Sequence, residues 1–207
     1  MDGPALDSTH RYEPGEAGWT PLLLLHGTGG DENDLLPLGR MVAPGAPLLS
    51  PRGKVLEGGM PRFFSRLAEG VFDEAEVAAR ADELADFIEA ARDRYGLASP
   101  VALGFSNGAN IAAAILYRRP RVLAGAILIR AMVTLEAAPR EPLDGRPVLV
   151  LSGASDPLIP AENAGRLADA LERAGGRVSH RTLPAGHGLT QGDVATARDF
   201  LAAEFPN

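Results

Sequence analysis

The pentapeptide Gly104-Phe105-Ser106-Asn107-Gly108 constrains the fold of this chain more than any other stretch. It follows the apolar run 101–103 and precedes a helical pattern rich in small residues, 110–119. A serine on a tight turn between a strand and a helix has a strained backbone, and its neighbours must be small so that strand and helix can approach. Gly104 and Gly108 meet that need, and the turn places the serine at the positive end of a helix. A glycine-rich turn with an incidental serine stays open as the alternative until the rest of the chain is considered.

Short apolar runs alternate with helical patterns along most of the chain. Runs such as Leu22–Leu25 and Val148–Leu151 are apolar throughout, which is typical of parallel strands covered on both faces. Polar and apolar residues alternate only in the last run, which predicts a strand near a sheet edge. We therefore predict a single α/β domain over residues 1–207, with a mostly parallel sheet of about seven strands and helices on both faces. The predicted strands are Thr9–Glu13, Pro21–His26, Pro47–Ser50, Val101–Phe105, Ala126–Arg130, Val148–Ser152 and Val178–Leu183, and the helices are 73–96, 110–119, 161–174 and one that follows Thr190.

Composition narrows the function classes. Twenty basic and 27 acidic residues give a net charge of −7, and the absence of a basic cluster argues against binding to nucleic acid or an anionic membrane. The chain has no cysteine, which excludes disulfides, thiolate metal sites and a cysteine nucleophile. Segment 1–18 lacks the pattern of a signal peptide, and run 22–25 is too short to span a bilayer, so we expect a cytoplasmic, soluble protein.

The ends of parallel strands are where reactive groups gather in such sheets. The first apolar strand ends in the loop His26-Gly27-Thr28-Gly29-Gly30, which would direct the backbone N–H of Thr28 at a developing oxyanion. The residue after the serine, Asn107, would give the second donor. Phosphate binding is excluded, because Glu32 stands where G-x-G-x-x-G needs its last glycine and no GK[ST] follows.

Two further strand ends are followed by an aspartate and a histidine that could take part in catalysis. Asp156 follows a buried strand in a turn that contains two prolines, and His187 lies between two glycines on a loop. Taken alone, the aspartate could cap its turn and the histidine could be a surface residue. Together with Ser106 they follow the order Ser, Asp, His expected of α/β-hydrolases. We therefore predict that the three form a catalytic triad.

The other histidines are assigned structural roles. His26 is expected to shape the glycine loop by hydrogen bonding, His10 to be solvated, and His180 to be a structural residue of the last strand. No HExxH pattern or clustered histidine and carboxylate spacing is present, so we predict neither a metal nor a cofactor.

Four motifs give the chain a family resemblance. They are Leu-His-Gly-Thr-Gly-Gly-Asp-Glu at 25–32, the serine pentapeptide, Gly-Ala-Ser-Asp-Pro at 153–157 and Gly-His-Gly-Leu at 186–189. The chain resembles the phospholipase/carboxylesterase family of α/β-hydrolases, which is related to acyl-protein thioesterases and dienelactone hydrolases. Segments 50–53 and 59–64 resemble a bacterial branch of carboxylesterases. The missing cysteine departs from dienelactone hydrolases, and Asn107 departs from the glutamine usual in the thioesterases, so the resemblance favours a plain serine esterase.

The expected activity is hydrolysis of small to medium carboxylic esters through an acyl-enzyme. An acyl thioesterase stays open as an alternative, as does a non-catalytic protein that binds a small ligand. Such a binder usually lacks a triad residue, and none is missing here. The partner would be a small-molecule ester, and the sequence permits a homodimer without indicating one.

The pocket is predicted from the loops around the strand ends. The short connection 130–147 predicts that no large lid is present, and segment 52–72 is the expected cover. We expect Arg130 to contact a polar or anionic part of the substrate and Arg62 to be a solvated surface residue. The two phenylalanines of the cover could instead anchor it to the core. The candidate pocket residues are Met60, Phe63, Phe64, Arg130, Met132 and Ile159.

Overall fold

The central sheet has seven strands in the order β1-β3-β2-β6-β7-β8-β9. A computed structural model describes residues 6–206. Residues 1–5 and residue 207 lie outside the described part, so the prediction for segment 1–18 falls partly outside it. The edge strand β1 pairs antiparallel with β3, and the other neighbours pair in parallel. The strands are β1 (His10–Glu13), β2 (Leu22–Leu25), β3 (Leu48–Pro51), β6 (Val101–Phe105), β7 (Gly125–Ile129), β8 (Pro147–Gly153) and β9 (Arg177–Leu183).

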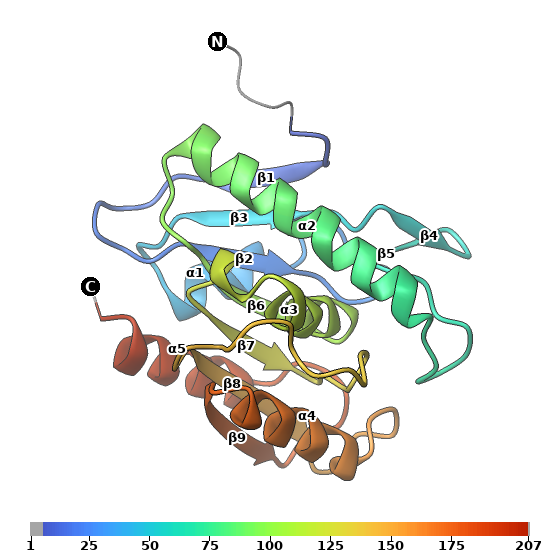
Figure 1. Cartoon of the computed structure of the whole chain (residues 1–207). Coiled ribbons are helices and arrows are strands. Elements are labelled where there is room, and N and C mark those ends of the chain that lie inside the picture. The colour runs from blue at the N-terminus through green and yellow to red at the C-terminus, as the bar shows by residue number, and fades with distance from the viewer. Residues whose placement is uncertain (1–5, 207) are drawn as a thin grey trace.

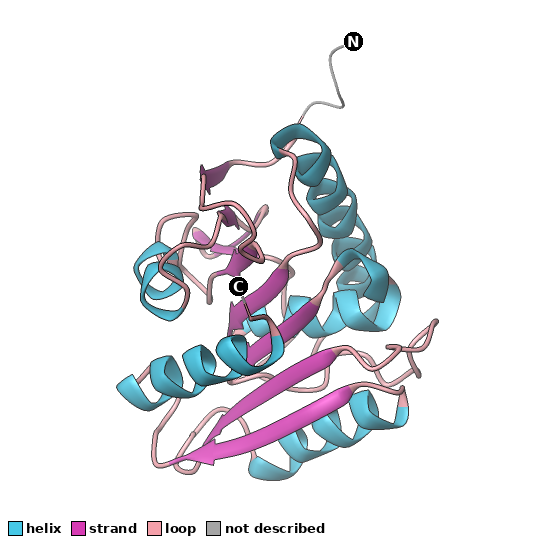
Figure 2. Ribbon diagram, turned by 90° about the vertical axis from the view of Figure 1, so that its left-hand side faces the viewer, coloured by secondary structure: helices cyan, strands magenta, loops and turns pink. Residues whose placement is uncertain are grey.

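Helices cover both faces of this sheet (Figures 1 and 2). One core cluster joins α2, α3 and α4 to one face, and a second joins α1 and α5 to the other. The predicted mostly parallel α/β architecture is confirmed. The helices are α1 (Leu36–Val42), α2 (Glu74–Tyr95), α3 (Asn107–Arg118), α4 (Ala161–Arg173) and α5 (Gln191–Glu204), with a 3-10 turn at Pro120–Val122.

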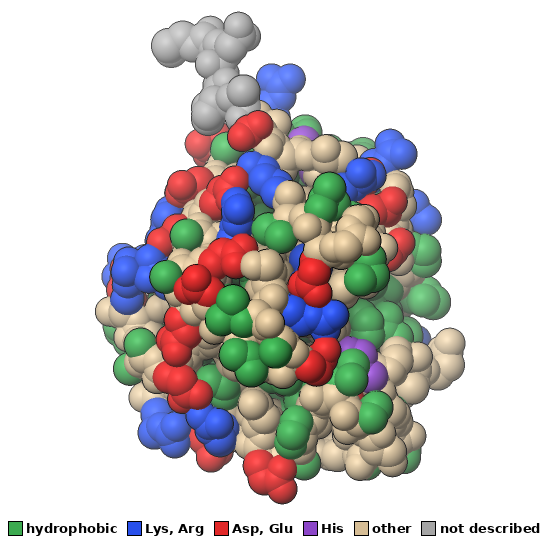
Figure 3. All heavy atoms as spheres, turned by 90° about the vertical axis from the view of Figure 1, so that its right-hand side faces the viewer, with side chains coloured by type: hydrophobic (Ala, Val, Ile, Leu, Met, Phe, Trp, Pro, Cys, Tyr) green, Lys and Arg blue, Asp and Glu red, His purple; other side chains and the backbone are tan. Residues whose placement is uncertain are grey.

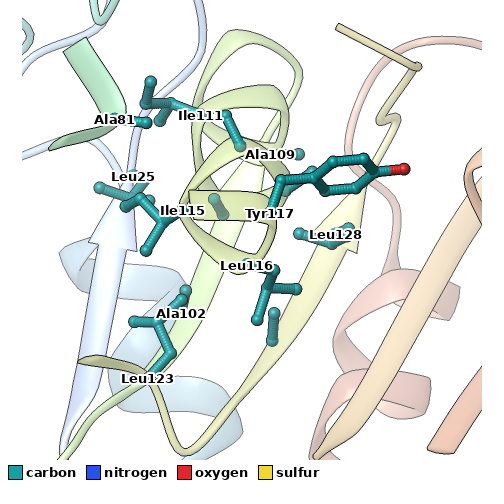
Figure 4. Close-up of a cluster of buried hydrophobic side chains, with 14 of the residues drawn as sticks. Leu25, Ala81, Ala102, Ala109, Ile111, Ile115, Leu116, Tyr117, Leu123 and Leu128 are labelled. Carbon is teal, nitrogen blue, oxygen red and sulfur yellow. The ribbon is translucent and has the colours of Figure 1, made fainter. Parts of the chain in front are cut away.

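Helix α3 packs against the sheet with Ile115 beside Leu25 of β2, and with Leu116 and Tyr117 on the side of Leu128 of β7 (Figure 4). Ile111 and Ile115 of α3 lie in one buried cluster with Leu25 and Leu128, and all four are fully buried. Burial of each such side chain stabilises the fold by about 1.5–3 kcal/mol. The alanines of α3, among them Ala109, allow its backbone to lie close to the strands. The start of α3, where Ser106 lies, is therefore held rigidly at the carboxyl end of β6.

Four elements were not predicted from the sequence: α1, the 3-10 turn, β4 (Val55–Glu57) and β5 (Met60–Arg62). The short helix α1 precedes β3, and β4 and β5 form a hairpin within the segment predicted to cover the pocket. Gly58 and Gly59 connect the two strands, and both have positive φ, at 58° and 84°. Residues 130–146, which connect β7 to β8, contain no helix or strand, and no large lid is present within the described residues, as expected.

Candidate active site

Ser106 lies on a strained turn between β6 and α3. Its φ of 53° and ψ of −115° fall in a region that L-residues rarely occupy. The flanking glycines permit the turn: a Cβ on Gly104 would lie 2.5 Å from the carbonyl oxygen of Gly108, and one on Gly108 would lie 2.0 Å from that of Leu25. The Ser106 N–H donates to the carbonyl of Ile129 at 2.8 Å. Strand β7 thus holds the strained residue in place.

The three predicted triad residues come together at the carboxyl ends of β6, β8 and β9. His187 Nε2 lies 3.0 Å from Ser106 Oγ, and His187 Nδ1 lies 2.9 Å from Asp156 Oδ2. The Asp156 side chain is only 1% exposed. Its Oδ1 also accepts hydrogen bonds from the N–H groups of Leu158 and Ile159, at 2.8 and 3.2 Å. The aspartate therefore both fixes its turn and contacts the histidine.

Two backbone N–H groups beside Ser106 are open to a ligand. Asn107 is the first residue of α3, so its N–H has no acceptor within the helix. Thr28 follows β2 in the glycine loop. Within residues 6–206, neither N–H donates a hydrogen bond to a protein acceptor. This is the placement expected of the donors of an oxyanion hole.

Segment 61–64 connects these two donor residues. The Gly29 N–H donates to the carbonyl of Pro61 at 3.0 Å, and Arg62 Nη1 donates to Thr28 Oγ1 at 2.5 Å. On the other side, the Phe63 N–H donates to Asn107 Oδ1 at 2.7 Å. Segment 61–64 thus sets the positions of Thr28 and Asn107, whose N–H groups lack a protein acceptor within residues 6–206.

The cavity beside Ser106 has a volume of about 210 Å³. It opens at the carboxyl edge of the sheet, the side viewed in Figure 3, where hydrophobic, basic and acidic side chains are interspersed. A mainly apolar hollow of about 160 Å³ lies elsewhere, between α1 and α5, and its lining includes no histidine or serine. The lining of the active-site cavity is Thr28, Arg62, Arg66, Glu69, Phe72, Phe105, Ser106, Asn107, Asn110, Met132, Leu158, Ile159 and His187.

The predicted pocket residues divide into two groups. Met132 and Ile159 line the cavity. Phe63 and Phe64 do not, because both are buried in the core, so the alternative that they anchor the cover describes them better. Met60 lies outside the lining and is 43% exposed on the hairpin. A sequence does not show whether an apolar side chain in a cover segment turns toward the pocket or toward the core.

Arg130 does not reach the cavity, contrary to expectation. It follows β7 with a φ of 57°, and its side chain forms a fully buried ion pair with Asp193 of α5, Nη1 to Oδ1 at 2.8 Å. Its guanidinium also donates to the carbonyls of Gly186 and Gly188, at 2.9 and 3.2 Å. These are the two neighbours of His187, so Arg130 fixes the loop on which the histidine lies.

Arg62 differs from the prediction in the opposite way. It was expected on the solvated surface, yet it is 4% exposed and lines the cavity. Its Nε donates to the carbonyl of Phe64 at 3.0 Å and lies 3.3 Å from Glu57 Oε2. Burial lowers the pKa of the Arg62 guanidinium from its ordinary value, and Glu57 opposes that shift.

The remaining histidines have structural contacts. His26 Nδ1–H donates to the Gly27 carbonyl at 2.7 Å, and Nε2 accepts from the Gly53 N–H at 2.9 Å, so it shapes the glycine loop as expected. Burial lowers the pKa of His26, which favours this neutral form. His180 contacts Ser152 Oγ at 2.8 Å. His10 is half-buried and bonded to the Tyr95 hydroxyl, rather than solvated.

The fold and the serine turn define an α/β-hydrolase. The chain belongs to the phospholipase/carboxylesterase family, whose model matches residues 13–204. It is 46% identical to the putative hydrolase MhqD of Bacillus subtilis over 193 residues, 92% of this chain and 96% of that protein. Family membership and relatives support hydrolase activity.

Solved structures agree with this assignment. The Bacillus cereus carboxylesterase is 41% identical, with a TM-score of 0.93 over 96% of this chain and 95% of the other. A carboxylesterase from Mesorhizobium loti is 34% identical, with a TM-score of 0.86 over 91% and 90%. Within residues 6–206, no helix has the length and apolarity needed to cross a membrane.

Proposed function

We propose that this hydrolase is a serine carboxylesterase that cleaves small to medium carboxylic esters. The observation that supports this best is the hydrogen-bonded series Asp156, His187 and Ser106, which ends on the strained serine turn. A serine hydroxyl is a weak nucleophile until an adjacent base removes its proton. His187 Nε2 lies within hydrogen-bond reach of that proton, and Asp156 holds the imidazole in the tautomer that can accept it.

The reaction follows from these positions. Ser106 Oγ attacks the ester carbonyl carbon while His187 takes the hydroxyl proton, and the carbonyl oxygen becomes an oxyanion bound by the N–H groups of Thr28 and Asn107. The bond to the alcohol oxygen then breaks, and His187 gives its proton to the leaving alcohol. Water attacks the acyl-enzyme by the same route and releases the acid. No cofactor enters either half of the reaction.

The cavity supports small and medium esters. Phe72, Phe105 and Ile159 give it apolar walls, and its volume of about 210 Å³ is below the usual range of about 300–1,000 Å³ for drug-sized ligands. Exposed apolar side chains also flank its opening on segments that contribute to the lining, among them Leu158, which is 44% exposed. A long acyl chain would extend beyond the cavity. A thioester has the same carbonyl geometry, so thioesters remain the alternative substrate class.

A matched substrate panel tests the proposal. Butanoate would be offered as an oxygen ester and as a thioester, and kcat/KM would be measured for each, with Ser106→Ala as control. We expect the oxygen ester to be hydrolysed at least as efficiently as the thioester, and both rates to disappear in the variant. A clear preference for the thioester would assign the thioesterase function. Turnover that survives in Ser106→Ala would contradict the mechanism.

A further inference from the structure

The active-site cavity contains an amide donor that no protein acceptor satisfies. Asn110, on the first turn of α3, lines the cavity and is 5% exposed. Its Oδ1 accepts from the Met132 N–H at 2.9 Å, which sets the orientation of the amide. Within the described residues, its Nδ2 donates no hydrogen bond, and the Oδ1 bond to Met132 is the one side-chain hydrogen bond of this residue. The amino group is therefore left for a ligand in the cavity.

Arg62 contributes a second donor of the same kind. Its Nε donates to Phe64 and its Nη1 to Thr28, while in the described part of the chain Nη2 donates to no acceptor. Within residues 6–206, Arg92 Nε is the one side-chain nitrogen or oxygen that is both closed to solvent and without a hydrogen-bond partner. Arg62 Nη2 and Asn110 Nδ2 also lack a partner, so both atoms must be open to solvent. Both residues line the active-site cavity and are at most 5% exposed, so we infer that a ligand reaches these donors through the cavity.

The charges around these donors determine which acceptor fits. Glu57 lies 3.3 Å from Arg62 and also bonds Arg66, which in turn pairs with Glu69. Two guanidinium groups and two carboxylates leave no net charge in this group. The atom that binds there is an acceptor oxygen because both unused groups, Arg62 Nη2 and Asn110 Nδ2, are N–H donors. The balanced charge suits both a ketone carbonyl and an ionised carboxylate. The apolar walls suit the carbon atoms between it and the ester.

We propose that the preferred substrates carry a second oxygen acceptor close to the ester, and that Arg62 and Asn110 bind it. The inference rests on the proposed esterase function and adds its substrate class. A site with buried donors selects against an analogue that lacks the matching oxygen, because the donors then remain unpaired. A purely apolar pocket of the same size would instead prefer the hydrocarbon analogue over the ester with the second oxygen.

Two isosteric series of alkyl esters test this, with hydrolysis followed by pH-stat titration. On the acyl side they are ethyl 4-methylpentanoate, ethyl 4-oxopentanoate and ethyl hydrogen succinate. On the alcohol side they are 3-methylbutyl acetate, 3-oxobutyl acetate and 3-acetoxypropanoate. We expect an oxygen-bearing ester to exceed its hydrocarbon isostere in kcat/KM by about tenfold or more in one series, the effect of one hydrogen bond to a charged donor. Equal rates, or a preference for the hydrocarbon, in both series would overturn the proposal.

Variants connect the preference to the two donors. Arg62→Met removes Nη2, and Asn110→Asp removes the amino group while it keeps the oxygen that Met132 needs. Arg62→Met also disturbs Thr28 and lowers all rates, so the readout is the ratio between isosteres, which a purely structural role would leave unchanged. We expect that ratio to fall toward one in both variants. The control Arg40→Met alters an exposed arginine that pairs with Glu13 and should keep the ratio. A ratio unchanged in both test variants would contradict the assignment.

The two proposals fail in different ways. A protein that forms a fluorophosphonate adduct on Ser106 but shows no preference for oxygen-bearing esters would refute the substrate class alone. A folded protein that forms no adduct and hydrolyses no ester would refute the esterase function, and the substrate class with it.

Discussion

Arg130 and Asp193 form an ion pair from which solvent is excluded, with both side chains fully buried. Two hydrogen bonds join them, Nη1 to Oδ1 at 2.8 Å and Nη2 to Oδ2 at 3.0 Å. The same guanidinium binds the carbonyls on either side of His187, and the same carboxylate caps α5 through Thr190. The pair thus connects the end of β7, which also holds the Ser106 N–H, to the loop of His187.

Breaking this pair should reduce both stability and turnover. Arg130→Met leaves the Asp193 charge buried and unpaired, which should lower the free energy of unfolding by about 3–5 kcal/mol. The double variant Arg130→Met/Asp193→Asn removes the unpaired charge and should recover part of that stability. Its kcat should nevertheless remain below that of the wild type, since the His187 loop has lost its anchor. Urea unfolding and steady-state kinetics measure the two effects, and full activity in the double variant would show that the pair serves stability alone.

Gly108→Ala should impair the serine turn. The added Cβ would lie 2.0 Å from the Leu25 carbonyl, so α3 must move away from the sheet. We expect a loss of about 1–3 kcal/mol in stability together with reduced kcat. Gly165→Ala in α4 is the matched control. Nothing lies within 4 Å of its added Cβ, and it should gain about 0.5–1 kcal/mol through helix propensity. Thermal unfolding of the two variants would separate the steric clash at Gly108 from the effect of a glycine-to-alanine change in a helix. Equal changes in stability would contradict the clash.

Asp156→Asn should reduce turnover without unfolding the protein. The asparagine oxygen can still accept from the N–H groups of Leu158 and Ile159, so the turn is preserved. The amide can no longer stabilise the imidazolium or fix the tautomer of His187. The equivalent change in the triad of a serine protease lowers kcat by about 10⁴, and we expect a loss of the same order here. A stable variant with near-normal kcat would contradict the role of the aspartate.

Acid should weaken the glycine loop through His26. Burial lowers its pKa below the ordinary value of 6.5, so the unfolded chain takes up the proton first. Its stabilising contribution is therefore complete above about pH 6.5 and declines as the pH falls from there to the lowered pKa. His26→Gln, which can still accept from the Gly53 N–H, should show a flatter dependence of unfolding free energy as the pH falls below about 6.5. An identical pH slope in both proteins would exclude His26 as the source.

The strands of the central sheet and the meeting of the three triad candidates could be predicted from the sequence because their signals are local. The glycines around Ser106, the apolar run before Asp156 and the alternating run before His187 each reflect a nearby backbone requirement. The hairpin β4–β5 has a local signal too, since Gly58-Gly59 between two short runs is typical of a two-residue turn. Each of those runs has only three residues, which is too few for an alternating strand pattern to stand out.

The roles of the two arginines could not be predicted in this way. Arg130 follows a strand that ends at the active-site edge, which favoured contact with substrate. Its direction is set by a positive φ and by Asp193, 63 residues later in the chain. Arg62 is the one charged residue of segment 59–64, and the hairpin turns it inward against Thr28. Both outcomes depend on tertiary partners that no local pattern reveals.

The most direct test of the triad mechanism is mass-spectrometric mapping of the protein after treatment with a fluorophosphonate ester, beside His187→Ala. We predict one adduct, on Ser106, that is lost or greatly slowed in the variant, because the serine reacts only when the histidine removes its proton. Folding of both proteins would be checked by circular dichroism. No adduct on the folded wild type, or equally fast labelling of Ser106 without His187, would contradict this mechanism.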